Sequence, residues 1–118
     1  MTIRQCYENM GSDFDGVLRR LGSEAMISRV AVKFLNDPSF NNLKSALAAG
    51  RTEEAFHAAH TLKGVCVNLG FDKLYECSSA LTELLRTGST DGADALMAEV
   101  EKNYEITAAA LREFRDSQ

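Results

Sequence analysis

The sequence of 118 residues contains no tryptophan, one proline and three cysteines. The cysteines (Cys6, Cys66 and Cys77) are odd in number and have no C-x-x-C spacing, which argues against a disulfide framework. We therefore expect reduced thiols and a cytoplasmic protein. One proline and no tryptophan, beside many alanines and leucines, favour a helical fold.

Features that would indicate other classes of protein are also missing. No apolar run approaches the roughly 20 residues of a membrane span, and the first residues lack the apolar segment of a secretory signal. The net charge is −4, whereas a nucleic-acid-binding domain carries an excess of basic residues. No glycine-rich phosphate loop occurs, so no ATP site is expected. We expect one domain over residues 1–118 that binds neither membrane nor nucleic acid and is not an enzyme by itself.

Apolar residues recur at helical spacing in six segments, and no strand-like alternation of useful length is present. The expected helices follow the N-cap candidates Ser12 or Asp13, Ser23, Asp37 (with Pro38 at the first helical position), Thr52 and Asp72, and the last covers residues 93–114. Short loops join antiparallel neighbours. The segments therefore predict an all-α fold, an up-and-down antiparallel four-helix bundle with one or two short N-terminal helices.

The expected central helix, residues 52–70, carries the most informative pattern. A buried stripe is predicted for Ala55, Ala59, Leu62, Cys66 and Leu69. His60 and Lys63, three residues apart, fall together on a neighbouring exposed face, and Gly64 follows on that face. A glycine inside a helix costs about 1 kcal/mol relative to alanine. Gly64 therefore indicates that something bulky approaches the helix beside His60, with a packing role inside the fold as the alternative.

The motif His60-Thr61-Leu62-Lys63-Gly64, with Leu69-Gly70 shortly after it, resembles the signature of the histidine-containing phosphotransfer (HPt) family. Further segments share the family's pattern: Gly22-Ser23-Glu24, Asp37-Pro38, Leu47-Ala48-Ala49-Gly50 and Leu74-Tyr75-Glu76-Cys77. The resemblance extends from about Phe14 to Phe114, which is nearly the whole chain.

This resemblance implies that His60 accepts a phosphoryl group from the aspartate of a response-regulator receiver domain, or from a kinase, and passes it to another receiver. The implied partners are receiver domains and a sensor or hybrid histidine kinase. The resemblance implies no cofactor on this chain, since Mg²⁺ belongs to the receiver. An exposed imidazole in its neutral form is nucleophilic, as an acceptor of a phosphoryl group must be. Lys63 would offset the phosphoryl charge, Gly64 would leave room for the receiver, and Arg86 would add a positive charge from the next helix.

Several assignments stay open from the sequence. Family members often have two small residues after the motif glycine, whereas this chain has Val65 and Cys66; if Val65 faces the phosphoryl site, the phosphohistidine lifetime would change. Phe56 and Val67 flank His60 either as core residues or as an apolar patch that docks a receiver.

Two other functions are alternatives to phosphotransfer. The first is a helical binding module that regulates a kinase or receiver without being phosphorylated. The second is a metal-binding bundle that uses His57, His60 and acidic residues, although the repeated Glu-x-x-His of di-iron bundles is absent.

Overall fold

The computed structural model describes residues 1–118 and contains helices but no strand, which confirms the predicted all-α class. The elements are α1 (Ile3–Asn9), α2 (Phe14–Leu21), α3 (Glu24–Lys33), the short 3-10 helix η1 (Phe34–Asn36), α4 (Ser39–Ala48), α5 (Thr52–Leu69), α6 (Asp72–Arg86) and α7 (Ala93–Asp116). None of the helices combines the length and apolarity that crossing a bilayer requires.

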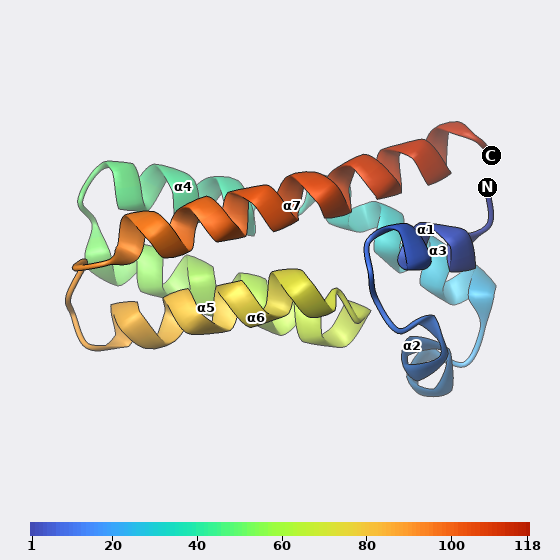
Figure 1. Cartoon of the computed structure of the whole chain (residues 1–118), viewed down its shortest axis with the longest axis horizontal. Coiled ribbons are helices and arrows are strands. Elements are labelled where there is room, and N and C mark those ends of the chain that lie inside the picture. The colour runs from blue at the N-terminus through green and yellow to red at the C-terminus, as the bar shows by residue number, and fades with distance from the viewer.

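The four helices from α4 to α7 lie side by side, whereas α1, α2 and α3 gather at the end of the molecule where both termini lie (Figure 1). Helix α5 packs against both α4 and α6, and α6 packs against α7. Helices α4 and α7 meet through the stacked rings of Phe40 and Tyr104, whose centroids are 3.8 Å apart, and through a 2.8 Å ion pair between Lys44 and Glu101. Helix α7 also packs against α1 and α3, so it joins the two parts of the fold.

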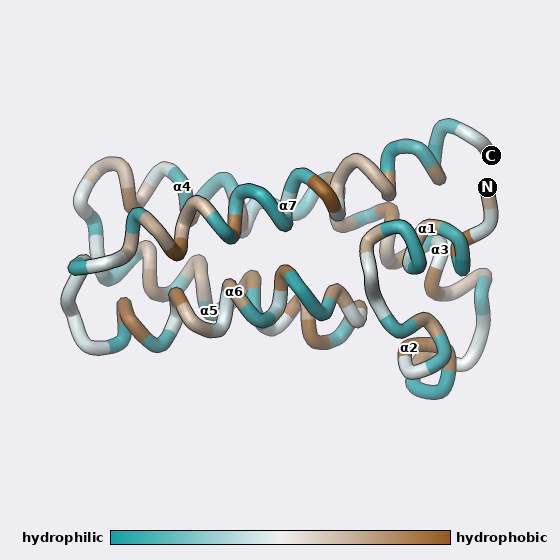
Figure 2. Tube along the Cα trace, in the orientation of Figure 1, coloured by the Kyte–Doolittle hydropathy of each residue, from teal (hydrophilic) through white to brown (hydrophobic).

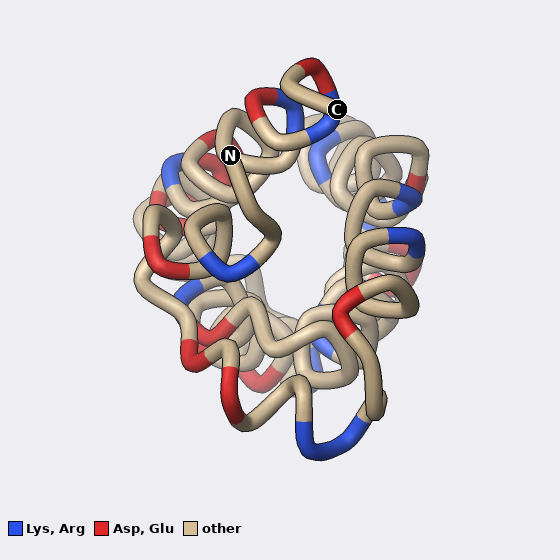
Figure 3. The backbone as a smooth tube through the Cα atoms, turned by 90° about the vertical axis from the view of Figure 1, so that its right-hand side faces the viewer, with Lys and Arg blue, Asp and Glu red and all other residues tan.

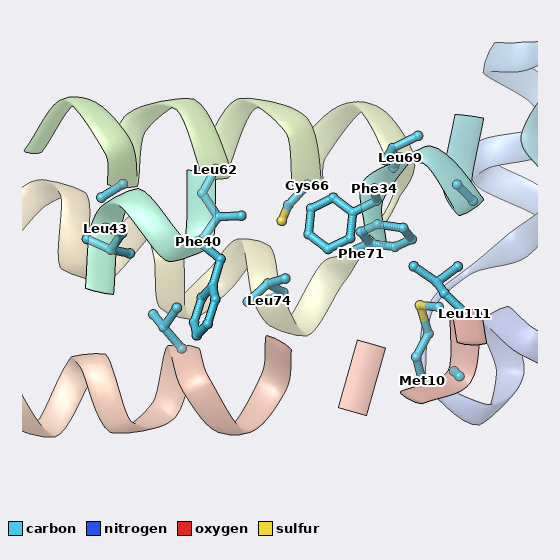
Figure 4. Packing of buried hydrophobic residues seen from close by; sticks show 14 of the residues in the cluster. Met10, Phe34, Phe40, Leu43, Leu62, Cys66, Leu69, Phe71, Leu74 and Leu111 are labelled. Atoms are coloured by element: carbon cyan, nitrogen blue, oxygen red, sulfur yellow. The ribbon is translucent and has the colours of Figure 1, made fainter. Parts of the chain in front are cut away.

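Hydrophobic and hydrophilic residues recur in turn along each helix, as in amphipathic helices (Figure 2). Charges of both signs lie around the outside of the molecule (Figure 3). The apolar sides form one buried cluster, in which Leu62 and Cys66 of α5 point inward (Figure 4). The stripe predicted for α5, which is Ala55, Ala59, Leu62, Cys66 and Leu69, is buried throughout, as predicted. All three cysteines are free, and burial raises the pKa of the Cys6 thiol to about 11. Burial also raises the pKa of the Cys66 thiol. Cys66 is therefore a packing residue rather than a reactive thiol.

Helix α1 was not predicted, so three α-helices and the short 3-10 helix η1, rather than one or two short helices, precede α4. Thr2 and Gln5 form a capping box at its start: the Thr2 hydroxyl accepts from the backbone N–H of Gln5 at 3.1 Å, and the side-chain oxygen Oε1 of Gln5 accepts from the backbone N–H of Thr2 at 2.9 Å. One face is buried through Ile3, Cys6, Tyr7 and Met10. The capping box and the apolar face are both visible in the sequence. A helix of seven residues is nevertheless stable only because its apolar face packs against the rest of the fold.

The predicted N-cap Ser23 makes the expected hydrogen bond: its hydroxyl accepts from the N–H of Met26 at 3.1 Å at the start of α3. At α4 the prediction is one residue off, because Pro38 is the N-cap and the helix begins at Ser39. The Asp37 carboxylate nevertheless accepts from the N–H of Ser39 at 2.9 Å. Side-chain oxygens thus satisfy donors that lack a partner within the helix.

The predictions of Thr52 and Asp72 as N-caps are wrong, because each residue is already the first residue of its helix. The carbonyl of the preceding residue, Arg51, accepts the first helical bond of α5 at 2.9 Å, and the carbonyl of Phe71 accepts that of α6 at 2.8 Å. The Asp72 carboxylate accepts instead from the backbone N–H of Asp13 at 3.2 Å. Asp72 therefore links α6 to the turn before α2.

The end of α5 is held by the N-terminal helices. The Tyr7 hydroxyl donates to the carbonyl of Leu69 at 2.7 Å, and the Arg20 guanidinium donates to the carbonyls of Val67 and Asn68 at 3.0 and 3.3 Å. The last carbonyls of a helix have no partner within the helix. Contacts from α1 and α2 therefore satisfy them and fix these helices at this end of α5.

Gly70, which ends α5, is expected to tolerate no side chain. Its φ is +73°, and a Cβ would lie 2.1 Å from Cγ2 of Val17 in α2. Replacing Gly70 with alanine should lower the free energy of unfolding by about 2 kcal/mol, because left-handed backbone and displacement of Val17 each cost about 1 kcal/mol or more. Gly50 is the matched control, with the same φ of +73° and no atom within 4 Å of its Cβ position. In denaturant unfolding, equal losses for Gly70→Ala and Gly50→Ala would contradict the role of the Val17 contact.

Candidate functional site

Helix α5 turns His60 away from the core. The neighbouring residues Ala59 and Leu62 are buried, whereas His60 is exposed. A step of three or four residues returns nearly to the same side of a helix, so Phe56, Lys63 and Gly64 share the face of His60. The structure therefore brings together on one surface the histidine, the lysine and the glycine that the sequence singled out.

Arg86 of helix α6 lies beside this surface, where it contacts an aromatic ring of α5. The half-buried ring of Phe56 lies nearly parallel to the His60 ring, with an interplanar angle of 7° and centroids 6.0 Å apart. The Arg86 guanidinium carbon lies 5.0 Å from the centroid of the Phe56 ring, a cation–π distance. Phe56 thus packs at the edge of the core and also links Arg86 to the surroundings of His60.

Glu83 connects the two cations and was not predicted from the sequence. Its carboxylate oxygens accept from Nε and Nη2 of Arg86 at 3.2 and 3.4 Å. One of the same oxygens lies 4.0 Å from Nζ of Lys63, whose side chain is 25% exposed. The pairing of Glu83 with Arg86 on α6 can be predicted from the sequence, because the two residues are three positions apart. The proximity of Glu83 to Lys63 depends on how α6 packs against α5, which no local sequence pattern predicts.

The cations change the acidity of this carboxylate. The Arg86 guanidinium, through its hydrogen bond and its charge, holds the pKa of Glu83 below its ordinary value, and Lys63 and His60 contribute in the same direction. Glu83 is therefore ionised at neutral pH. The surface beside His60 carries two positive charges and one negative charge.

Gly64 is not required by the packing of this chain. A Cβ built on Gly64 would meet no atom within 4 Å outside the surrounding helix. Its backbone is also ordinary helix, since its φ is not positive. The structure therefore gives no support to a packing role, and the open space beside His60 is available to another molecule.

The two residues after Gly64 do not face His60. Val65 lies about 140° around the helix from His60 and lines a groove that includes Leu21 and Val30. Cys66 is completely buried in the core. The structure thus supports packing roles for both residues.

Val67 extends the exposed face of α5 two turns beyond His60. It is 48% exposed, and it is one of the few large apolar side chains on the surface. The sequence left open whether this residue belongs to the core, and the structure places it outside.

His57 occupies a different part of the surface. Its Nε2 lies 4.0 Å from an oxygen of Glu53, one turn earlier on α5, and its side chain is 69% exposed. The structure contains no group of three or more His, Cys, Asp or Glu side chains placed to hold a metal ion. The metal-binding alternative based on His57 and His60 therefore has no donor set.

Comparison with known proteins gives one family. Residues 36–113 match the Hpt domain, and this segment includes His60, Lys63, Gly64, Glu83 and Arg86. No curated protein and no solved structure matches the chain. Helices α1 to α3 precede the matched segment. Since the match covers more than half of the sequence, the chain belongs to the Hpt domain family, the phosphotransfer domains of phosphorelay signalling.

Proposed function

We propose that this chain is a phosphorelay intermediate in which His60 accepts a phosphoryl group from the aspartate of a receiver domain, or from a histidine kinase, and transfers it to another receiver. The observation that carries the proposal is the surface around His60. An exposed imidazole, the nearby ammonium of Lys63 and the unfilled space over Gly64 occur together within the segment that matches the Hpt domain.

The exposed ring suits a nucleophile that must enter another protein's active site. A neutral imidazole has one ring nitrogen with a free lone pair. This lone pair forms the N–P bond as the P–O bond to the receiver aspartate breaks, and the carboxylate leaves with the electron pair. The proton on the second ring nitrogen stays there until it exchanges with water. The reverse exchange with the aspartate of a second receiver completes the relay and needs no further reactant.

The chain supplies charge and space for this step, and the partner supplies the rest of the site. Lys63 and Arg86 provide positive charge beside a group that carries nearly two negative charges. The receiver's acidic pocket holds the Mg²⁺, so no cofactor is assigned to this chain. The chain itself is a carrier rather than an enzyme.

The direct test is to mix the purified chain with a phosphorylated receiver domain and Mg²⁺ and to follow labelled phosphate. We expect acid-labile phosphate on the chain, at one site that mass spectrometry of fragments assigns to His60. Stable binding of the receiver without any transfer would favour the alternative of a binding module that is not phosphorylated. Phosphate on His57 would contradict the assignment of the acceptor.

Replacing Lys63 with alanine should slow phosphate acceptance, or shorten the lifetime of the product, by about three- to tenfold. The effect is modest because a single partly exposed charge contributes about 1 kcal/mol in a water-like environment. Transfer rates and phosphohistidine decay should be measured for wild type and Lys63→Ala. Lys102→Ala on α7 is the control, since it removes one exposed lysine elsewhere. An unchanged rate and lifetime in Lys63→Ala would remove Lys63 from the mechanism.

A further inference from the structure

Glu83 places a negative charge where the proposed function brings in more negative charge. It is the carboxylate shared by Arg86, at 3.2 and 3.4 Å, and Lys63, at 4.0 Å. Both cations lie on the surface that surrounds His60. Arg86 contacts the ring of Phe56, which lies parallel to the His60 ring, and Lys63 is on the same face of α5 as His60. A residue needed only to strengthen binding of a phosphoryl group would not be an acid at this position, because like charges repel.

The contacts show what Glu83 does before His60 is phosphorylated. A lysine side chain has several freely rotating bonds and loses considerable entropy when it is fixed. The Glu83 carboxylate lies within ion-pair distance of Lys63 and is itself oriented by the fork of Arg86. Glu83 therefore joins Lys63 of α5 to Arg86 of α6 while no phosphate is present.

Phosphorylation changes this balance of charges. The new group competes with Glu83 for the same two cations, and its charge of nearly −2 repels the carboxylate. Glu83 is 57% exposed, so its side chain is free to turn toward water when the cations are taken. An intermediate that held its phosphoryl group with both cations and no opposing charge would release it less readily to the next receiver.

This inference rests on the proposed function. We propose that Glu83 is a positioning residue that sets the free energy of the phosphorylated chain relative to the phosphorylated receiver. It orders the two cations before transfer, and it lowers the stability of phosphorylated His60 so that the group moves on. The competing interpretation is that Glu83 only forms a surface ion pair with Arg86 within α6.

The experiment measures the equilibrium ratio of phosphorylated chain to phosphorylated receiver for wild type, Glu83→Gln and Glu83→Asp. Glu83→Gln should raise the ratio in favour of the chain by about three- to tenfold at low salt, with a smaller increase at high salt because exposed charges are screened. Glu83→Asp keeps the charge and should stay closer to wild type. Glu76→Gln is the control, an exposed acid two turns earlier on α6, roughly 10 Å away along the axis.

The outcomes separate this inference from the function on which it rests. A higher ratio in Glu83→Gln that shrinks with salt, with Glu76→Gln unchanged, supports the role of Glu83. An unchanged or lower ratio in Glu83→Gln, with phosphate still reaching His60, overturns this inference alone. A chain that takes no phosphate in any form overturns the proposed function and this inference together.

Discussion

Replacing His60 with glutamine is expected to abolish phosphate acceptance while leaving the fold intact. Glutamine has a similar length and can form hydrogen bonds, but its amide nitrogen has no free lone pair to attack phosphorus. The side chain at position 60 is exposed, and surface substitutions of this kind change the free energy of unfolding by about 0.5 kcal/mol or less. We therefore expect no labelled phosphate on His60→Gln after incubation with a phosphorylated receiver, together with an unchanged unfolding midpoint.

His57→Gln is the matched control for this prediction. The two histidines are on the same helix, one turn apart, and both are exposed. His57 has no lysine three residues later. The Phe56 ring also lies near His57, at a centroid distance of 5.4 Å, but it is tilted by 60° to the His57 ring. His57→Gln should therefore accept phosphate at the wild-type rate. Equal labelling of wild type and His60→Gln would refute the assignment of His60. Loss of labelling in His57→Gln alone would move the acceptor one turn back along α5.

The part of the site that lies on one helix was predictable from the sequence. The period of 3.6 residues fixes which side chains of a helix share a face once the buried stripe is known. The stripe in α5 contains residues such as Leu62 and Cys66, which are buried as predicted. The positions of His60, Lys63 and Gly64 on the exposed surface follow from it, without knowledge of any other helix.

The part of the site that joins two helices was not predictable in the same way. Arg86 was expected near His60 only as a general addition of positive charge, and Glu83 was not considered. Their positions depend on the turn at Gly70, where Phe71 donates to the carbonyl of Cys66, and on the packing of α6 against α5 that follows. The same limit applies to Asp72, whose partner, Asp13, is distant in the sequence.

Glycine at position 64 is expected to make this protein less stable and more active than a version with a side chain there. A Cβ would meet nothing within 4 Å, and Gly64 lies inside α5, where alanine is favoured over glycine by about 1 kcal/mol. Gly64→Ala should therefore raise the free energy of unfolding by about 0.5–1 kcal/mol. Leucine also favours helices, so Gly64→Leu should be at least as stable as wild type.

The rate of phosphate transfer should fall in the same variants, because the receiver occupies the space over Gly64 when its aspartate reaches His60. Transfer requires the reacting atoms to approach to about 3–3.5 Å, and a displacement of about 1 Å can cost a hundredfold in rate. We expect a loss of roughly tenfold for Gly64→Ala and roughly a hundredfold for Gly64→Leu. Ala98→Leu, which adds bulk at an exposed position of α7, should transfer normally. Wild-type transfer by Gly64→Leu would show that the receiver approaches His60 from another side. A lower stability of Gly64→Ala would show that the glycine serves the fold of the free chain.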